Sequence, residues 1–486
     1  MENLMPFEWS VDSPEFEIPE WSNLGYNKIP APEMSRHFLI LGETGSGKTK
    51  SAIIPLMKSI LNTYVGLKCP SALIIDPKNE LYDYIKQDHR VINYNKISIE
   101  EKRVIDFFEG ERENLNADIV KSKILQLFPQ GHDERNIFFL KQLELTLLAF
   151  LKIDFIEYNA GGLDHLISFW NNFVEAAQTI RKSFEEYDEE KKVVFRSVEQ
   201  RNLWYAYEDI KLKCGWSQGN YFLRFLALIN NVYALRYLLI YWKTVRPECE
   251  ITESYQQLNQ LFDMGVKGVE GQLAGVIGSV NNVLIKLTDQ DLLSKVNFNP
   301  FQPPSKLLSI QDVMESGNWF VYAPTGNSEM EDLIARSIKA KFFDYTFKRK
   351  DKERPFAYIC DEFQRFITND RQSGEQSYLD RCRAFRVICV LATQSLASLI
   401  YTMQSAGFGA ELSESSLNIL LNNTGNKLFF RNTDLDTIRK LANLIPQPYT
   451  NGKPHVISVR PPSTLKPGEC YYLLCNGRWG RAKVEI

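Results

Sequence analysis

The chain has 486 residues, a length that accommodates about two or three domains and a large buried core. Its 57 lysines and arginines are balanced by 60 aspartates and glutamates, which gives a formal net charge of −3. This balance excludes a strongly basic protein that binds nucleic acid over its whole surface, so any DNA contact has to be local.

The first predicted elements alternate between strand and helix. After an acidic, aperiodic arm over 1–35, the sequence reads as an apolar strand at 37–41, a helix ending at Leu61, a strand over SALIID and a helix over ELYDYIKQ. This βαβ order predicts a parallel sheet.

A glycine-rich loop follows the first strand directly. Residues 36–49 read RHFLILGETGSGKT, which is the spacing of the phosphate-binding loop of nucleoside triphosphatases. Glycines let several backbone N–H groups point into one concave nest, and the following helix directs its positive dipole end there. We expect the lysine to bind the terminal phosphates and Thr49 to ligate Mg²⁺. The predicted nucleotide-binding residues, for ATP or GTP, are Gly42, Glu43, Thr44, Gly45, Ser46, Gly47, Lys48, Thr49 and Lys50.

The middle of the chain changes character. From about 114 to 299 the apolar residues recur at helical spacing, and the charged stretch SFEEYDEEKK is typical of a solvated helix face or loop. The alternation of strand and helix returns after residue 300. We therefore predict an α/β nucleotide-binding core built from 36–113 and 300–486, with an all-α domain over 114–299 inserted into it.

Two acids end a predicted strand in the second half of the core. The segment FAYICDEF places Asp361 and Glu362 at the carboxyl end of an apolar run. Beside a complete phosphate loop, the first acid is expected to support the Mg²⁺ shell and the second to polarise the attacking water. A solvated strand end is the alternative.

A further strand ends in an amide. The stretch RAFRVICVLATQS runs from Arg383 to Gln394 and Ser395, and the amide of Gln394 can lie beside the γ-phosphate and orient water. Motor ATPases whose sites lie between subunits also need a cation from the neighbouring subunit. Arg383 and Arg386 are the candidates, with an ordinary surface charge as the alternative for each.

These segments together resemble a known family. RHFLILGETGSGKT, SALIIDPKNELYDY, FAYICDEF and RAFRVICVLATQS are similar to the FtsK/HerA superfamily of DNA-pumping ATPases, and within it to the type IV secretion coupling proteins of the TraG/TraD group. The resemblance extends over about 36–480. It implies a RecA-like fold, ATP and Mg²⁺ as cofactors, Gln394 as sensor and Arg383 as a finger acting in a neighbouring subunit's site.

The resemblance also implies partners. It implies a homo-hexameric ring with a central channel, a helical insert that receives cargo, and DNA as substrate, single-stranded or as nucleoprotein. Secretion-channel or relaxosome proteins would be the other partners. The chain departs from the family where Asn79 and Arg386 replace usual glycines and where no pair of membrane-spanning helices precedes the core.

The remaining features of the sequence bear on the cellular location of the protein and on metal binding. The acidic N-terminus has no signal-peptide pattern, and the apolar stretch from Phe222 to Trp242 contains two arginines, so we expect a buried or amphipathic helix there. These features predict a cytoplasmic protein, which would reach the inner face of the membrane only through partners. No CxxC pair occurs among the eight cysteines, and the five histidines lack ligand spacing, which gives a zinc site little support.

Three functions remain open at this stage. The first is a coupling ATPase that pumps DNA or protein, favoured by the large helical insert and the DPKNEL motif. The second is a HerA-like translocase of duplex DNA in repair or defence, favoured by the missing membrane anchor. The third is a nucleotide-binding scaffold, which would need no catalytic acid. The basic run at 347–354 is expected to form an exposed turn and NGRWGR a hairpin, and neither identifies a DNA-contacting residue.

Overall fold

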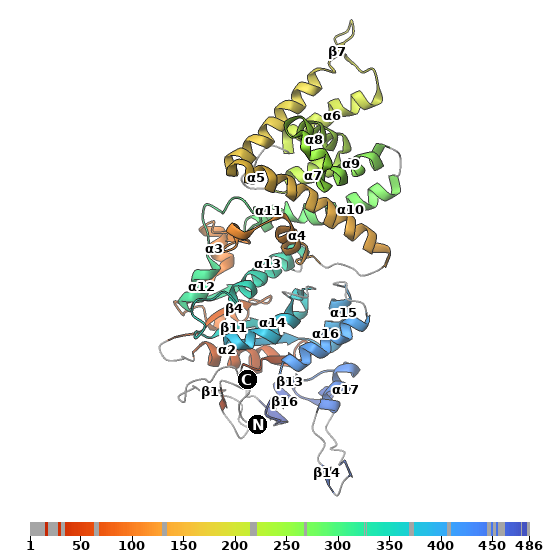
Figure 1. The fold of residues 1–486 in the computed structure, drawn as a ribbon. Helices are drawn as coiled ribbons and strands as arrows, with labels where there is room; N and C mark the ends of the chain where they lie inside the picture. The colour runs from red at the N-terminus through yellow and green to blue at the C-terminus, as the bar shows by residue number, and fades with distance from the viewer. Residues whose placement is uncertain are drawn as a thin grey trace. The chain divides into compact units, whose positions relative to one another are not determined.

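The computed structural model divides the chain into two compact units (Figure 1). The nucleotide-binding unit comprises 1–103, 129–131 and 308–486, and the helical unit comprises 104–128 and 132–307. The structure describes residues 15–17, 28–30, 35–62, 68–128, 134–213, 221–266, 270–324, 326, 328–368, 374–405, 410–444, 449–450, 453–454, 462–477 and 479–483.

A nine-stranded sheet forms the nucleotide-binding unit, in the order β17-β16-β13-β3-β12-β11-β4-β10-β5. The strands from β13 to β5 in this order pair in parallel, and β16 and β17 pair antiparallel at one edge. The predicted α/β class with a mostly parallel sheet is confirmed, and the strands before the phosphate loop and before the two acids belong to one sheet. The bounds are β3 (Phe38–Leu41), β4 (Ser71–Ile75), β5 (Val91–Asn93), β10 (Trp319–Tyr322), β11 (Phe356–Cys360), β12 (Val387–Thr393), β13 (Asn426–Phe430), β16 (Glu469–Leu473) and β17 (Trp479–Lys483).

Helices cover both faces of this sheet (Figure 1). Alternate residues of β3, β4, β11 and β12 pack with the apolar side of α2 (Ile54–Leu61) in one buried cluster. On the other face, aromatic side chains of α13 (Glu329–Thr346) and α14 (Glu375–Cys382) pack on the strands, as Phe343 does on Tyr358. Because both faces are covered, the strands are almost uniformly apolar.

Shorter elements complete the nucleotide-binding unit. The predicted helix over ELYDYIKQ is only a short 3₁₀ turn, η2 (Tyr82–Tyr84). The remaining elements are η1 (Thr49–Ile53), α3 (Tyr94–Glu100), α12 (Ile310–Ser316), η5 (Phe363–Phe366), η6 (Arg383–Phe385), α15 (Leu396–Ser405), α16 (Ala410–Asn423), α17 (Leu435–Leu444), η7 (Pro462–Thr464) and the two-stranded pairs β1–β2 (Glu15–Glu17, Lys28–Pro30) and β14–β15 (Tyr449–Thr450, Lys453–Pro454). Most of the predicted arm over 1–35 lies outside the described residues.

The second unit is mostly helical. It also contains two small two-stranded sheets, β6–β9 and β7–β8, so the prediction of an all-α insert is too strict. The charged stretch SFEEYDEEKK contains β7 and the turn that leads to β8. The elements are β6 (Ile105–Asp106), η3 (Arg112–Asn114), α4 (Ala117–Leu125), α5 (Glu134–Lys182), β7 (Glu186–Tyr187), β8 (Val193–Val194), α6 (Val198–Lys213), α7 (Leu223–Asn230), α8 (Val232–Val245), η4 (Pro247–Ile251), α9 (Glu253–Val266), α10 (Glu270–Leu287), α11 (Gln290–Leu293) and β9 (Val296–Asn297).

Two glycines interrupt the longest element of this unit. Within α5, Gly161 and Gly162 leave helical backbone geometry, and Gly162 has a φ of 76°. The element therefore consists of two helices joined by a kink.

A buried ion pair organises the core of the helical unit. Asp154 of α5 pairs with Arg224 of α7, and its carboxylate also accepts hydrogen bonds from Trp170 Nε1 (2.7 Å) and Tyr221 OH (2.5 Å). The guanidinium of Arg224 lies over the Tyr221 ring at 4.3 Å. This network explains how an arginine can lie inside the apolar stretch over 222–242, as predicted for a buried helix.

The same stretch forms two helices instead of one. Asn231 separates them and caps α8, since its side chain accepts hydrogen bonds from the backbone N–H groups of Tyr233 and Ala234. Within the part of the chain that the structure describes, no single helix has the length and apolarity to cross a membrane, although α7 and α8, bent by 110°, meet those criteria as a pair.

Candidate functional site

The phosphate loop leaves β3 at the carboxyl edge of the sheet. It is tied to both neighbouring strands, because Gly42 N–H donates to Thr393 O (3.2 Å) and Glu43 N–H donates to Arg431 O (3.0 Å). Lys48 Nζ donates to Gly42 O at 2.7 Å, so the lysine side chain folds back across the loop. The loop is thus a closed concave turn held on a rigid sheet.

Two glycines have backbone angles that this turn requires. Gly45 has a φ of 76° and Gly47 a φ of 94°. A Cβ at Gly47 would also lie 2.7 Å from Gly468 N, a group that donates to Ser46 O. A side chain at Gly47 would therefore strain the backbone and push away the segment that closes the loop.

The helix after the loop begins at Thr49 with a π-helical turn, η1, and continues as α2 to Leu61. Thr49 Oγ1 lies 3.4 Å from Asp361 Oδ2. The Ser46 hydroxyl is buried inside the loop and has no hydrogen-bond partner among the described residues. A hydroxyl beside a carboxylate is a suitable ligand pair for Mg²⁺, and an unsatisfied buried hydroxyl fits a loop that receives phosphate oxygens.

Glu362 lies next to this pair and is 6% exposed. Its carboxylate accepts hydrogen bonds from Gln364 Nε2 (2.6 Å) and Gln394 Nε2 (3.1 Å) at Oε2, and Lys78 Nζ lies 2.9 Å from Oε1. The backbone of Glu362 has a φ of 49°, an uncommon conformation for a residue other than glycine. The acid and the amide singled out from the sequence therefore touch each other.

Charge and burial act together on the ionisable groups of this edge. Burial lowers the pKa of Lys48, against the opposing effect of Asp361 and Glu362. Burial also raises the pKa of Glu362, but the hydrogen bonds from Lys78 and Gln364 outweigh it, and the net pKa is lowered. Glu362 is thereby held as a carboxylate in a largely dry site.

Comparison with known proteins supports this picture. A family model described as the central domain of helicase HerA matches residues 28–196. Unbound conjugative coupling protein TrwB aligns with a TM-score of 0.53 and 13% identity, and TrwB in complex with ADP and Mg²⁺ with 0.54 and 12%; both alignments cover 96% of this chain and 89% of the other. The curated protein sequences contain no match.

The chain shares the fold of the conjugative coupling protein TrwB over nearly its whole length, and 28–196 match the HerA central-domain model. The fold expected from the resemblance in sequence is confirmed. The two residues that replace the family's usual glycines keep the backbone that glycine would adopt, since Asn79 has a φ of 54° and Arg386 a φ of 53°. Asparagine tolerates the left-handed conformation, and Arg386 is held in it by its partners.

Arg383 lies at the opposite edge of the sheet from the phosphate loop. It precedes β12, whereas Gln394 follows β12 and hydrogen-bonds Glu362. Seven strand residues separate the two edges by about 20 Å. Arg383 therefore cannot reach the phosphate loop of its own chain, and its partly buried guanidinium has its pKa lowered by burial and by Arg36.

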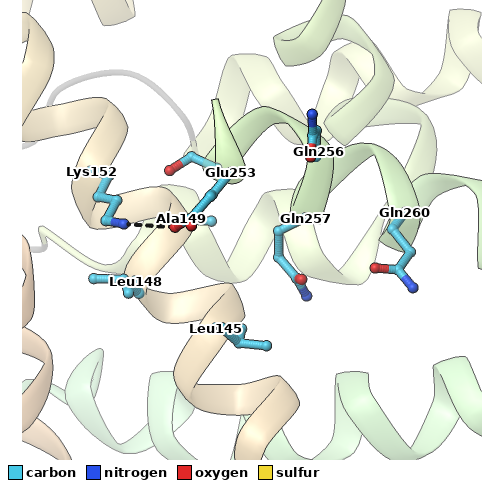
Figure 2. A pocket seen from close by; sticks show the side chains of 9 residues that line it. Leu145, Leu148, Ala149, Lys152, Glu253, Gln256, Gln257 and Gln260 are labelled. Carbon is cyan, nitrogen blue, oxygen red and sulfur yellow. Dashed lines mark hydrogen bonds and ion pairs between the residues drawn. The ribbon is translucent and has the colours of Figure 1, made fainter. Parts of the chain in front are cut away.

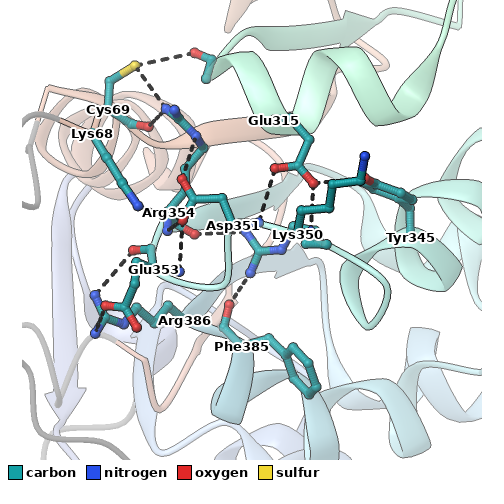
Figure 3. A network of polar contacts seen from close by, with 12 residues as sticks. Lys68, Cys69, Glu315, Tyr345, Lys350, Asp351, Glu353, Arg354, Phe385 and Arg386 are labelled. Carbon is teal, nitrogen blue, oxygen red and sulfur yellow. Dashed lines mark hydrogen bonds and ion pairs between the residues drawn. The ribbon is translucent and has the colours of Figure 1, made fainter.

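Arg386, the other candidate finger, directly precedes β12 and contacts the turn before β11 (Figure 3). It is buried, and its guanidinium pairs with the Glu353 carboxylate and donates to Glu353 O. The basic run over 347–354 forms this turn, but Arg349 is 2% exposed and donates to Arg354 O (2.8 Å) and to Phe385 O. The expectation of a simply exposed basic turn is wrong for Arg349.

Three residues of the site are missing from the sequence-based prediction. Lys78 and Gln364 contact Glu362, and Arg431, which follows β13, forms an ion pair with Glu43 of the phosphate loop. The DPKNEL motif pointed to the segment of Lys78 without giving it a role. Nothing in the local sequence marks Arg431, because its partner comes from the other half of the core.

The fold also gathers His37 with two cysteines, in spite of the scattered positions of the histidines in sequence. His37 Nδ1 accepts the N–H of Cys389 (3.2 Å), and Nε2 lies 3.6 Å from Cys382 Sγ. All three are buried. Because Nδ1 is an acceptor, the neutral ring has its proton on Nε2, the nitrogen that faces the sulfur. The cluster is explained as a hydrogen-bonded core group.

A separate pocket lies in the helical unit, between α5 and α9 (Figure 2). It has a volume of about 330 Å³ and is lined by leucines and glutamines, with an ion pair between Lys152 and Glu253 at 3.4 Å. The glutamines lining it are Gln256, Gln257 and Gln260. None of the candidate catalytic residues contributes to this pocket.

Proposed function

We propose that this protein is a motor ATPase of the coupling-protein type that hydrolyses ATP and moves DNA. One arrangement carries the proposal: a phosphate loop whose Thr49 faces Asp361, beside a buried Glu362 that is hydrogen-bonded to Gln394. A scaffold that only binds nucleotide would have no need of the carboxylate and amide beside the loop.

Each residue has a distinct part in the proposed reaction. Backbone N–H groups of Thr44, Gly45 and 47–49 and the Lys48 ammonium bind the phosphates, and Thr49 and Asp361 would hold Mg²⁺, which supplies charge neutralisation to the phosphates when bound. Glu362 accepts a hydrogen bond from the attacking water and orients it, and Gln394 places its amide between this carboxylate and the γ-phosphate. GTP is an alternative nucleotide for the same loop.

We further propose that the active sites are completed between subunits of a homo-hexameric ring. Arg383 lies too far from its own phosphate loop to act there, so a neighbouring subunit's γ-phosphate is the place where its charge is useful. In related phosphoryl-transfer enzymes an arginine supplied by a partner raises the rate by about 10³- to 10⁵-fold.

The proposed cargo is DNA, single-stranded or as nucleoprotein, delivered to a type IV secretion or conjugation channel. The TrwB structures, described as those of a conjugative or plasmid coupling protein, support this choice through their shared fold. Relaxosome or channel proteins would be the partners. The predicted insert over 114–299, which lies within the helical unit except for its 129–131 segment, would receive the cargo. The protein would work in the cytoplasm and reach the membrane through these partners.

A HerA-like translocase of double-stranded DNA is the second candidate. The match of residues 28–196 to the central domain of helicase HerA favours it. Both candidates share the hydrolytic site and differ in the DNA that they move.

ATP hydrolysis by the wild-type protein, measured with and without DNA over a range of protein concentrations, tests the proposal. We expect turnover that depends on Mg²⁺, rises steeply with protein concentration, and is stimulated more by single-stranded than by double-stranded DNA. Lys48→Ala should abolish it. Stimulation by duplex DNA alone would favour the HerA-like function, and binding of nucleotide without any turnover would contradict both motor functions.

A further inference from the structure

A lysine outside the phosphate loop reaches the two acids of the site. Lys78 Nζ lies 2.9 Å from Glu362 Oε1 and 3.6 Å from Asp361 Oδ2. We propose that Lys78 is a positioning residue for hydrolysis, which holds the Glu362 carboxylate in the orientation needed to polarise the attacking water. This inference rests on the proposed ATPase function and adds a residue to it.

The fold brings Lys78 to this place. It follows β4, which pairs with β11 so that Ile75 lies beside Cys360, and the residues after both strands meet at the carboxyl edge of the sheet. Lys78 and Glu362 therefore meet although they come from opposite halves of the core.

The turn that carries Lys78 is built to be rigid. The buried Asp76 accepts the N–H groups of Glu80 (3.1 Å) and Tyr82 (3.0 Å), and Asn79 N–H donates to Asp76 O (3.0 Å). Pro77 fixes one backbone angle, and Asn79 adopts the left-handed conformation that reverses the chain. The DPKNEL sequence thus forms a closed turn from which the lysine side chain extends to the acids.

The donors around Glu362 divide its two oxygens. Gln364 and Gln394 both donate to Oε2, whereas Lys78 is the side chain that contacts Oε1 among the described residues. With Oε2 alone held by the two amides, the carboxylate could still rotate about that oxygen. The ammonium of Lys78 at Oε1 removes this freedom. A carboxylate that orients water gains from this fixed geometry, since small misplacements of catalytic groups are costly in rate.

The lysine also supplies charge where the acids need it. The ammonium lies 2.9 Å from a Glu362 oxygen and 3.6 Å from an Asp361 oxygen, so one positive charge is shared by both acids. The Lys78 side chain is 34% exposed, so it can remain in place while its stem borders solvent. Lys78 can therefore hold the carboxylate of Glu362 while the site stays open to solvent.

The test compares Lys78→Met with Lys78→Arg and with Lys86→Met. Lys86 is a matched control, because it lies on the same segment, is exposed and pairs only with Asp83 at 2.8 Å in the contacts described. We expect Lys78→Met to lower kcat about 10- to 100-fold, below the full contribution of a general base, while the nucleotide Kd changes less than about threefold. Lys78→Arg should retain more activity than Lys78→Met, and Lys86→Met should match the wild type.

A double mutant separates positioning from a general effect on folding. In the Glu362→Gln background, Lys78→Met should lower kcat no further, because the group that it positions is already altered. The melting temperatures of all variants are measured alongside, and Lys78→Gln replaces Lys78→Met if the latter does not fold. Wild-type kcat for Lys78→Met, a loss confined to Kd, or a loss that adds fully to that of Glu362→Gln would each overturn the inference. Absence of turnover in the wild type would instead refute the proposed ATPase function.

Discussion

Each unit of the molecule buries a carboxylate beside a cation, but the two pairs have different surroundings. In the helical unit, the side chains of Asp154 and Arg224 are 0% and 3% exposed, and aromatic residues enclose them. In the nucleotide-binding unit, the side chain of Glu362 is 8% exposed while that of its partner Lys78 is 34% exposed.

This difference in exposure distinguishes an ion pair that only stabilises the fold from one that belongs to a candidate functional site. An ion pair enclosed on all sides fixes the packing of the helices that contribute it, and it has no route to a ligand. A buried carboxylate whose donors border solvent can offer its oxygens to a water or a substrate. In sequence both acids end or interrupt an apolar run, so only their three-dimensional surroundings distinguish the two roles.

Within this comparison of two buried carboxylates, the largest expected effect comes from Glu362→Gln. The variant should keep its fold and bind nucleotide, since the amide retains the shape of the side chain, but its kcat should fall by about 10²- to 10⁴-fold through loss of the water-polarising carboxylate. Steady-state turnover and nucleotide Kd measure this. Near-normal turnover would show that Glu362 is no more catalytic than Asp154.

Arg224→Met tests the other half of the comparison. Removing the guanidinium leaves the Asp154 carboxylate buried, with the hydrogen bonds from Trp170 and Tyr221 as its remaining ones among the described residues. The helical unit should therefore lose about 3–5 kcal/mol of stability. Urea denaturation combined with hydrogen exchange of peptides from this unit measures the loss.

The double variant Asp154→Asn with Arg224→Met is the control. It removes both charges together and should recover most of the stability, because no unpaired ion remains. A single variant as stable as the wild type would show that the pair contributes nothing to the helical unit.

A buried cation without a carboxylate sharpens the comparison further. Lys427 is 5% exposed, donates to Thr424 O, and forms no ion pair among the described residues. Burial lowers its pKa to about 8, helped by Lys440 and opposed by Cys475. Because the unfolded chain keeps the proton to about pH 10.5, its contribution to stability should rise with pH between about 8 and 10.5.

Lys427→Met should remove this pH dependence and stabilise the protein at pH 7 by at most about 3 kcal/mol. Denaturation curves of both proteins between pH 7 and 10.5 provide the check. If stability changed with pH in the same way for the wild type and the variant, the pKa of Lys427 would not be lowered in the folded protein.

Local patterns predict the core of the site. The glycine spacing of 42–49, the acids after β11 and the amide after β12 each lie within one short segment, and the sheet brings the three segments to one edge. Their assigned roles remain predictions. The partners Lys78 and Arg431 could not be predicted, because each contacts a residue of the other half of the core, across the inserted unit.

The failures of local reasoning also have physical causes. ELYDYIKQ has helical spacing, but Asp76 accepts the backbone N–H groups of Glu80 and Tyr82 and holds this segment in a turn. Arg349 belongs to a charged run, yet backbone carbonyls satisfy its guanidinium inside the fold. In the first case local hydrogen bonds from the backbone to a side chain outweigh the helical pattern. In the second, a hydrogen bond to Phe385, which is distant in sequence, outweighs the charged pattern.

The most direct test of the account is complementation between two inactive subunits. Arg383 lies across the sheet from its own phosphate loop, and in the proposed ring each active site uses the arginine of a neighbour. Arg383→Ala and Lys48→Ala proteins should each be inactive alone, and their mixture should regain part of the wild-type ATPase activity, since some interfaces pair an intact arginine with an intact loop. A mixture that stays inactive while subunit exchange is demonstrated, or full-rate hydrolysis by dilute monomer, would contradict the account.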